Sequence, residues 1–250
     1  MKYNPFSLEG KVIFITGASS GIGRATAIEC SRMGATLIIS GRNKERLNET
    51  FCKLDGQSHL QVIADIKTVV GRNEILDKIP CIDGIVHCAG VSGHTLFSFL
   101  KEEVINDMFQ VNYFSPTLLT LDLLKSKRIN KSASIVFITS TSGINSSYIG
   151  GSLYSSTKGA INGLIKGMAL DLAPKKIRVN SVMPAMVETP IMIDGDVSKE
   201  QFEEDKKRYP LKRYGKPEEV AFAIIYLLSN ASSWTTGTNL LLDGGRTISY

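Results

Sequence analysis

Apolar residues along this chain follow two alternating spacings, which predict strands and helices in turn. Short β-branched runs bounded by glycine or polar residues predict buried strands, and longer stretches with apolar residues every three or four positions predict helices. Strands are expected at 11–16, 35–40, 60–64, 83–87, 134–139, 177–182 and 239–242, and helices at 24–33, 44–54, 68–78, 101–125, 153–172 and 217–228. This alternation predicts an α/β fold with a parallel sheet and helices on both faces.

The 250 residues contain no linker rich in proline, glycine or serine, so we expect one domain over residues 1–250. The segment that follows the sixth predicted strand is long, charged and punctuated by Gly195 and Pro210. Loops with these features often close over a ligand. We therefore expect a substrate lid at about 185–214.

Composition narrows the class of protein. The formal net charge of +5 comes from interspersed charges of both signs, whereas nucleic-acid binders cluster basic residues on one face. The longest apolar run, 221–228, is too short to cross a bilayer. These features favour a cytoplasmic protein that binds neither nucleic acid nor membrane. The four cysteines, Cys30, Cys52, Cys81 and Cys88, lack metal-site spacing and are expected to be buried and reduced, with no metal bound.

A glycine-rich turn joins the first strand to the first helix. It reads Gly17-Ala18-Ser19-Ser20-Gly21-Ile22-Gly23. Free backbone N–H groups and the positive end of a helix meet at such a junction and suit a pyrophosphate. Gly17 permits the tight turn, Gly21 lets the backbone approach the ligand, and Gly23 lets the helix pack against the strand.

The same residues match the Gly-x-Ser-x-Gly elbow of α/β-hydrolases, with Ser19 at the nucleophile position. Those enzymes place the catalytic histidine late in the chain, after the serine and the acid. The three histidines here, His59, His87 and His94, all lie before residue 95. Their order argues against a hydrolase.

The residues after the second strand indicate which dinucleotide is bound. An acidic side chain at this place binds the ribose 2′-hydroxyl of NAD, whereas a basic residue accommodates the 2′-phosphate of NADP. Gly41 occupies the acid position and Arg42 follows it, which favours NADP(H) over NAD(H), although Arg42 also fits an ordinary surface charge. Because the carboxyl ends of parallel strands share one edge, Gly17, Arg42, Asp65 and Gly90 are expected to gather there.

Tyr154 and Lys158 lie four residues apart in a predicted helix, so their side chains should project side by side. The ordinary pKa of a phenol is about 10, and bringing it to about 7 requires about 4 kcal/mol in favour of the phenolate. An ammonium about 6 Å away supplies roughly 3 kcal/mol at an effective dielectric constant of about 20. A second positive charge, such as that of an oxidised nicotinamide, would close the gap. The pair alone also fits a solvated helix face.

Two further polar residues gain meaning beside Tyr154. Ser140 follows a predicted strand and precedes the Tyr154 helix, although serine after a strand is also a common turn residue. Asn112 lies inside the apolar pattern of the helix predicted at 101–125, where it fits either a site residue or a core amide. Pro116 is expected to bend that helix.

In their order along the chain, these motifs resemble the short-chain dehydrogenase/reductase family over essentially the full length, with a general likeness to 3-oxoacyl-(acyl-carrier-protein) reductases. The resemblance implies a single-domain doubly wound Rossmann fold with a seven-stranded parallel sheet of strand order 3-2-1-4-5-6-7. It also implies an oxidoreductase that interconverts a ketone or 3-oxoacyl group and a secondary alcohol by hydride transfer with NADP(H). The matching residues are Thr16-Gly17-x-x-x-Gly21-Ile22-Gly23, Asp65, Ala89-Gly90, Asn112, Ser140, Tyr154-x-x-x-Lys158, Asn180 with Pro184, and Asp243-Gly244-Gly245.

The resemblance implies a role for each motif. Tyr154 would be the general acid/base, and Ser140 would hydrogen-bond the substrate carbonyl. Lys158 would hold the nicotinamide ribose and lower the pKa of Tyr154, and Asn112 would support a water-linked proton relay. Asp65 and Ile66 would border the adenine, and Val187 and Thr189 would contact the carboxamide. The full expected cofactor set is Gly17, Ser19, Ser20, Gly21, Ile22, Gly23, Arg42, Asp65, Ile66, Ala89, Gly90, Tyr154, Lys158, Pro184, Val187 and Thr189.

The chain departs from the family pattern in three places. The usual Asn-Asn-Ala-Gly is His87-Cys88-Ala89-Gly90, the usual Pro-Gly is Pro184-Ala185, and the interval from Ser140 to Tyr154 is one residue longer than is common. The longer interval leaves Thr141 as a second candidate for the serine's role. Relatives that reduce enoyl groups carry Tyr and Lys seven residues apart on this helix, and Gly at position 151 disfavours that chemistry.

The resemblance also suggests partners. It implies a homotetramer or homodimer built on the helices predicted at 101–125 and 153–172, where Gly159, Ala160, Gly163 and Gly167 permit close approach. An acidic acyl carrier protein is a candidate partner besides a small-molecule ketone or alcohol. The basic residues considered for its docking, which solvated surface charge explains as well, are Lys125, Lys127, Arg128, Lys131, Lys175 and Lys176. The alternative function is an NADPH-binding sensor or scaffold of the same fold without turnover.

Overall fold

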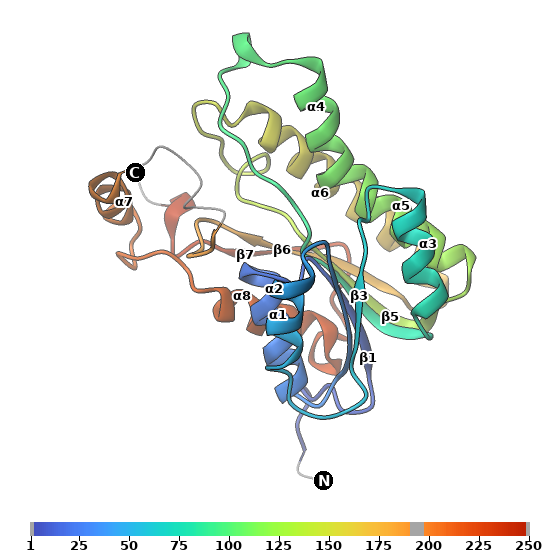
Figure 1. Cartoon of the computed structure of the whole chain (residues 1–250). Helices are drawn as coiled ribbons and strands as arrows, with labels where there is room; N and C mark the ends of the chain where they lie inside the picture. The colour runs from blue at the N-terminus through green and yellow to red at the C-terminus, as the bar shows by residue number, and fades with distance from the viewer. Residues whose placement is uncertain (1–2, 191–197, 249–250) are drawn as a thin grey trace.

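The predicted strands form one seven-stranded sheet in the computed structural model, which describes residues 3–190 and 198–248 (Figure 1). All neighbouring strands run parallel, and their order is β3-β2-β1-β4-β5-β6-β7. The predicted α/β class, parallel sheet and strand order are confirmed. The strands are β1 Val12–Thr16, β2 Thr36–Gly41, β3 Leu60–Ile63, β4 Ile82–His87, β5 Ile129–Ile138, β6 Arg178–Pro184 and β7 Asn239–Leu242.

Helices cover both faces of the sheet because successive side chains of a strand point to opposite sides. In β1, Ile13 and Ile15 belong to a core shared with α1, α2 and α8, whereas Phe14 belongs to a second core shared with α3, α5 and α6. Two apolar layers therefore sandwich the sheet. The α-helices are α1 Gly21–Arg32, α2 Lys44–Phe51, α3 Val69–Lys78, α4 Glu102–Phe109, α5 Ser115–Lys125, α6 Ser152–Leu172, α7 Lys199–Lys206 and α8 Pro217–Leu228.

The helix predicted at 101–125 is divided into α4 and α5 by a π-helical turn, Gln110–Phe114. Both the backbone N–H and the hydroxyl of Ser115 donate to the carbonyl of Gln110, the hydroxyl at 2.6 Å. Pro116 has no N–H to donate to the carbonyl four residues earlier, which is that of Asn112. The predicted irregularity is therefore present, but it takes the form of a widened turn just before the proline.

Strand β5 begins earlier than the predicted residue 134. Ile129 pairs with Ile82, and the register then shifts before Ser134 pairs with Gly84. Polar residues at 130–132 occupy this irregular stretch, and one of them, Ser132, has a φ of +64°. Their polarity hid the start of the strand from a pattern based on apolar residues.

The prediction of buried thiols is right for Cys30 and wrong for two other cysteines. Cys30 is buried in the core, Cys88 is half-buried, and Cys52 and Cys81 are exposed. Cys52 lies just past the end of α2, and Cys81 lies in the turn before β4. Both occupy the ends of elements, where the chain leaves the core. All four are free thiols.

Candidate active site at the carboxyl edge of the sheet

The glycine turn after β1 is shaped by close backbone contacts. Gly17 has a φ of +66°, and a Cβ atom there would lie 2.7 Å from the backbone N and Cα of Ala89. A Cβ atom on Gly23 would collide with the carbonyl of Gly17. Side chains larger than hydrogen are therefore excluded at both positions. The turn lies directly against the Ala89-Gly90 pair that follows β4.

The N-terminus of α1 can accept an anionic ligand. Within the described chain, its N-cap residue, Ser20, is extended and makes no side-chain cap, and the first turn contains no acidic residue. The first N–H groups of the helix therefore lack the side-chain acceptor that often satisfies them. Such groups, together with the positive end of the helix dipole, bind phosphates well. The turn fits the pyrophosphate of a dinucleotide.

The end of β2 leaves little room for an acidic side chain. A Cβ atom on Gly41 would lie 3.3 Å from Oγ of Ser19, which is tighter than an ordinary contact. Arg42 follows with an exposed side chain, for which no ion pair or side-chain hydrogen bond is found in residues 3–190 and 198–248. A guanidinium is thus available beside the glycine turn.

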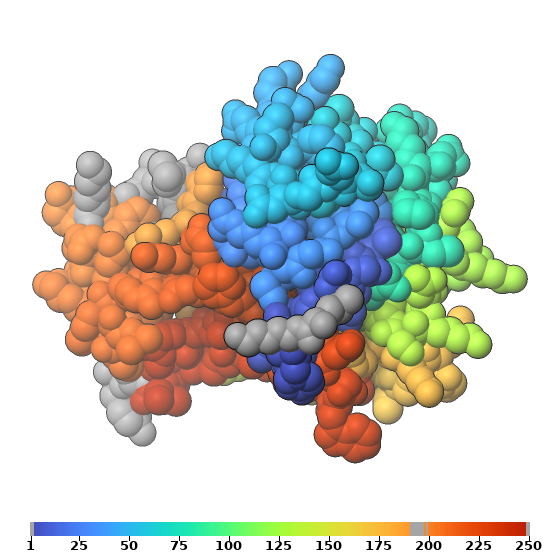
Figure 2. Space-filling view, turned by 90° about the horizontal axis from the view of Figure 1, so that it is seen from below, coloured from blue at the N-terminus to red at the C-terminus, as the bar shows by residue number. Residues whose placement is uncertain are grey.

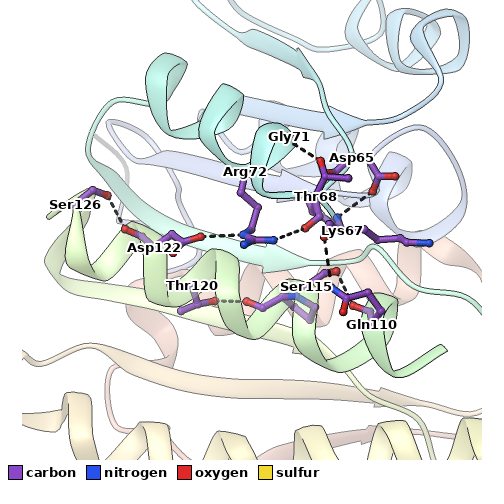
Figure 3. A network of polar contacts seen from close by, with 12 residues as sticks. Asp65, Lys67, Thr68, Gly71, Arg72, Gln110, Ser115, Thr120, Asp122 and Ser126 are labelled. Carbon is purple, nitrogen blue, oxygen red and sulfur yellow. Dashed lines mark hydrogen bonds and ion pairs between the residues drawn. The ribbon is translucent and has the colours of Figure 1, made fainter. Parts of the chain in front are cut away.

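The loop after β3 rests on the helices behind it (Figure 3). Ile66 is buried, and its carbonyl accepts a hydrogen bond from Nη1 of Arg72 at 3.4 Å. The Nε atom of the same buried guanidinium lies 2.9 Å from Oδ2 of Asp122 on α5. Asp65 accepts a backbone N–H from two residues later at 3.0 Å. An ion pair between α3 and α5 therefore supports the Asp65-Ile66 loop.

Tyr154 and Lys158 lie side by side on α6, as predicted. Nζ of Lys158 is 5.7 Å from the centre of the Tyr154 ring, and it donates a 2.7 Å hydrogen bond to the carbonyl of Ile138. A Cβ atom on Gly90 would lie 3.8 Å from the same Nζ and 3.3 Å from Oδ1 of Asn112. The buried ammonium is therefore close to the loop after β4 as well as to the phenol.

Ser140 acts on the Tyr154 phenol and lowers its pKa in the manner of a hydrogen-bond partner. Ser140 is buried just past the end of β5, and its Oγ accepts the N–H of Ser142 at 3.1 Å. Thr141 is also buried, and its backbone N–H donates to the carbonyl of Pro184 at 3.1 Å. Of the two hydroxyl residues, Ser140 is the one that acts on the pKa of Tyr154.

The pKa values of the pair differ from the expectation. Burial raises the pKa of Tyr154 to about 12, and its hydrogen bond with Ser140 acts in the opposite direction. Burial lowers the pKa of Lys158 to about 8, against the influence of the nearby Cys88 thiol. Removal from water disfavours the charged forms of both groups, so the pKa of Tyr154 lies above that of an ordinary phenol and not below it. At pH 7 the phenol is protonated and the lysine is mostly an ammonium.

The side chain of Asn112 ties three elements together. Its Oδ1 accepts the N–H of Val91 at 2.9 Å, and its Nδ2 donates to the carbonyl of Val91 at 2.9 Å and to Oγ1 of Thr157 at 3.1 Å. The amide is buried, and both its oxygen and its nitrogen are engaged in these contacts. It thus fixes the loop after β4 against the π-helical turn and α6, one residue before Lys158.

The residues after β6 reach the glycine turn. Pro184 is the last residue of β6. Val187 is buried and forms an isolated β-bridge with Gly215. A Cβ atom on Gly21 would lie 3.2 Å from Cγ2 of Thr189. The first part of the expected lid therefore adjoins the predicted cofactor site. Residues 191–197, in the middle of that expected lid, lie outside the described residues.

Comparison with known proteins decides the family. A family model described as Enoyl-(Acyl carrier protein) reductase matches residues 17–247. The 3-oxoacyl-(acyl-carrier-protein) reductase of Thermotoga maritima is 35% identical, covering 96% of this chain and 99% of that protein, and the enzyme of the same name from Aquifex aeolicus is 31% identical, covering 95% and 98%. The chain belongs to the short-chain dehydrogenase/reductase family.

Solved structures of short-chain dehydrogenases/reductases agree with this fold. A protein from Beutenbergia cavernae, provisionally assigned as an NAD(P)-dependent gluconate 5-dehydrogenase with NADP bound at low occupancy, superposes with a TM-score of 0.89 at 28% identity, covering 98% of this chain and all of that one. The chain is accordingly an oxidoreductase of a family that binds nicotinamide cofactors. None of the helices in the described residues is long and apolar enough to cross a bilayer.

One departure from the family pattern lies at the end of β4, where His87 packs into the core. His87 replaces the family's first asparagine and is buried, stacked 4.7 Å from the ring of Phe137. Its Nε2 lies 2.8 Å from Oγ1 of Thr120, which itself donates to the carbonyl of Pro116 at 2.8 Å. Nε2 is therefore the protonated nitrogen, and Nδ1 has no partner among the described residues.

Two residues near the phenol were missed by the family motifs. The rings of His94 and Tyr148 stack with centres 6.0 Å apart, and the Tyr148 ring centre is 6.5 Å from that of Tyr154. They lie in the loop after β4 and the loop before α6, in sequences without regular periodicity. The extra residue between Ser140 and Tyr154 was the one available signal that this loop is unusual.

Proposed function

We propose that this short-chain dehydrogenase/reductase reduces a ketone or 3-oxoacyl group to a secondary alcohol with NADPH, and that Tyr154 is its general acid. The observation that carries the proposal is the convergence of the Tyr154 phenol, the Ser140 hydroxyl and the Lys158 ammonium beside the glycine turn. The relatives from Thermotoga and Aquifex, named as 3-oxoacyl reductases, support the same reaction class.

The chemistry of reduction matches the protonation states of these groups. Hydride addition to a carbonyl leaves negative charge on oxygen, which requires hydrogen-bond donors and a proton. With a pKa of about 12, Tyr154 holds its proton at pH 7 and can deliver it. Ser140 offers a second hydrogen bond, and the Lys158 ammonium favours the phenolate that forms. The bound NADPH supplies the hydride.

Asn112 acts in this proposal by holding the site together. Its contacts with Val91 and Thr157 keep the loop after β4 and the start of α6 in fixed positions. The water-linked relay suggested by the family likeness remains a proposal. Because Pro116 has no N–H to donate to the backbone carbonyl of Asn112, that carbonyl is the group that would bind water.

NADP(H) is the proposed cofactor, with NAD(H) as the poorer ligand. Gly41 is crowded by Ser19 at the position of an NAD-type acid, and Arg42 presents an exposed guanidinium next to it. A guanidinium matches a phosphate in charge and geometry. The proposed cofactor residues are otherwise those of the glycine turn, Asp65-Ile66, Ala89-Gly90, the Tyr154-Lys158 pair and the start of the lid.

Turnover of NADPH tests the function. Wild-type protein should consume NADPH with an acetoacetyl thioester or another ketone. Tyr154→Phe should lower kcat by about 10² to 10⁴-fold while still binding NADPH. Undiminished turnover in Tyr154→Phe would refute the assignment. Binding of NADPH without consumption across a panel of ketones would instead support the alternative, a sensor or scaffold of this fold.

The basic residues considered for carrier-protein docking lie far from the site. Ser140 follows the end of β5, whereas four of them lie at or near its start: Lys125, Lys127, Arg128 and Lys131. The strand has ten residues at about 3.3 Å each, so about 30 Å separates its two ends. Figure 2 views this opposite side, with the segment near residue 130 in light green next to the gold segment near 175. A 3-oxoacyl thioester remains a proposed substrate, but these residues give no support to an acyl carrier protein.

We also propose a homodimer or homotetramer built on α4–α5 and α6. Cβ atoms on Gly163 and Gly167 would meet nothing within 4 Å, although glycine inside a helix costs about 1 kcal/mol relative to alanine. Leu170, on the same face of α6, is 77% exposed. Leu121 on α5 and Phe114 just before that helix are exposed as well. Sedimentation should detect the oligomer, and Gly163→Leu should dissociate it; a purely monomeric wild-type protein would exclude it.

The single-domain arrangement with a substrate lid at about 185–214 is kept as a proposal. The described end of this segment is anchored, because Leu211 donates to the carbonyl of Gly244 at 3.3 Å, and a Cβ atom on Gly245 would lie 2.7 Å from Pro210. The Tyr214 hydroxyl also donates to Asp205 at 2.9 Å. The Asp243-Gly244-Gly245 turn thus supports one base of the proposed lid.

A further inference from the structure

A wall of two aromatic rings stands beside the phenol that is proposed to deliver the proton. The ring of Tyr148 is tilted by 45° from that of Tyr154 at a centre-to-centre distance of 6.5 Å. His94 lies nearly parallel to Tyr148, with an angle of 17° between the rings. Tyr148 is 42% exposed and His94 is exposed, so both rings have surface that a ligand can reach.

The wall is held in place by two loops. The hydroxyl of Tyr148 donates to the carbonyl of Gly93 at 3.0 Å, and the N–H of Thr95 donates to the carbonyl of Gly150 at 2.9 Å. These bonds tie the loop after β4 to the loop before α6. The extra residue between Ser140 and Tyr154 lies in the second loop and lengthens it.

Two consecutive glycines make room for the rings. A Cβ atom on Gly151 would lie 2.7 Å from the Tyr148 ring, and one on Gly150, where φ is +79°, would lie 3.0 Å from the His94 ring. A side chain at position 151 would push the Tyr148 ring aside, and one at position 150 would crowd the His94 ring and strain the backbone. The wall is therefore a packed feature of the fold and not a pair of loose surface side chains.

The accessible surface of the wall is aromatic. The Tyr148 hydroxyl is engaged with Gly93, and burial raises the pKa of Tyr148, so this residue presents a neutral ring to a ligand. Aromatic rings in contact prefer offset or edge-to-face arrangements with centres about 4.5–7 Å apart. This surface is thus available to a substituent of a carbonyl group that reaches Tyr154.

We propose that His94 and Tyr148 form a specificity wall that selects ketones carrying an aromatic ring next to the carbonyl. The inference rests on the proposed ketone reduction at Tyr154. An aryl substituent gains ring–ring contact in addition to apolar burial, worth about 2- to 12-fold in affinity. A linear acyl chain gains the burial alone.

Two ketones of equal carbon number test the wall. The ratio of kcat/KM for acetophenone over octan-2-one should exceed one in the wild type and fall by about fivefold in Tyr148→Leu, which removes the ring. Tyr148→Phe keeps the ring and should keep the ratio. Tyr3→Leu is the matched control, because Tyr3 is 90% exposed at the far end of the chain. An unchanged ratio in Tyr148→Leu would overturn the proposal, and His94→Ala replaces that variant if it fails to fold.

A binding measurement separates this proposal from the proposed reaction. Calorimetry of acetophenone with Tyr154→Phe loaded with NADP⁺ should give a Kd about fivefold lower than the same titration with Tyr154→Phe/Tyr148→Leu. Equal Kd values would overturn the wall even if ketones are reduced. A fivefold difference without any turnover by the wild type would support the wall and refute the proposed function.

Discussion

Nζ of Lys158 donates a 2.7 Å hydrogen bond to the carbonyl of Ile138, the last residue of β5. This bond joins α6, which carries Tyr154, to the end of the strand that leads into Ser140. The phenol, the hydroxyl and the ammonium are therefore positioned by the junction of one strand and one helix. Deprotonation of the buried ammonium removes its positive charge from beside Tyr154, so the titration of Lys158 should affect activity.

Activity in the direction of reduction should fall as pH rises through about 8. Burial lowers the pKa of Lys158 to about 8, so its ammonium is present below that pH and lost above it. The Tyr154 pKa of about 12 lies beyond the range of the measurement. We expect kcat/KM for ketone reduction to decline about tenfold per pH unit above 8. Lys158→Arg, which stays charged, should be slower but lack this decline; the same decline in that variant would assign it to another group.

The serine's role can be separated from that of its neighbour. Ser140→Ala should lower kcat by about 10² to 10³-fold, because it removes one donor to the developing oxyanion. Thr141→Ala should change kcat by less than about fivefold, since Ser140 is the residue that acts on the pKa of Tyr154. Steady-state kinetics at saturating NADPH measures both. A larger loss in Thr141→Ala than in Ser140→Ala would reverse the assignment.

Removal of the Arg42 guanidinium should change cofactor preference. Arg42→Ala should raise the Kd of NADPH by about 10- to 100-fold, the effect of a charge-assisted hydrogen bond, with little change for NADH. Fluorescence titration with both cofactors measures the ratio. Arg32→Ala, which removes the same charge at the other end of α1, is the control. Equal weakening for both cofactors would show that Arg42 does not contact a 2′-phosphate.

The ion pair in Figure 3 should contribute to cofactor binding as well as to stability. Asp122→Asn weakens the hold on Arg72, whose guanidinium also bonds the carbonyl of Ile66. We expect the free energy of unfolding to fall by about 2 kcal/mol, less than for a fully buried pair, and the Kd of NADPH to rise. Reduced nicotinamide mononucleotide, which lacks the adenine, should bind equally well to variant and wild type. Equal losses for both ligands would place the effect elsewhere.

Acid should destabilise the fold through His87. Burial lowers the pKa of this imidazole to about 3, whereas in the unfolded chain it is about 6.5. Between these values the unfolded state binds a proton that the folded state does not, so stability present above pH 6.5 is lost as pH falls. The loss at pH 5 relative to pH 7.5 should be about 2 kcal/mol. Chemical denaturation of His87→Asn should lack this component; an identical pH slope in that variant would exclude His87 as its source.

Much of the fold followed from local patterns because each strand and helix buries an apolar face. The runs that became β1, β7 and α8 were predicted almost to the residue, and the parallel order followed from the family likeness. The start of β5 was missed because residues 130–132 are polar, and its pairing depends on β4, which is distant in sequence. Sequence placed Tyr154 beside Lys158 because residues four apart on a helix share a face.

Tertiary structure alone decided the rest of the site. The pKa of Tyr154 could not be derived from spacing, because it depends on how much water the surrounding elements exclude. The pairing of Asn112 with Val91, and of His94 with Tyr148, joins loops whose sequences have no shared period. The sequence thus determined which chemical groups this protein carries and which helix presents the central pair. Packing determined their protonation and their neighbours, since both arise from contacts between segments far apart in the chain.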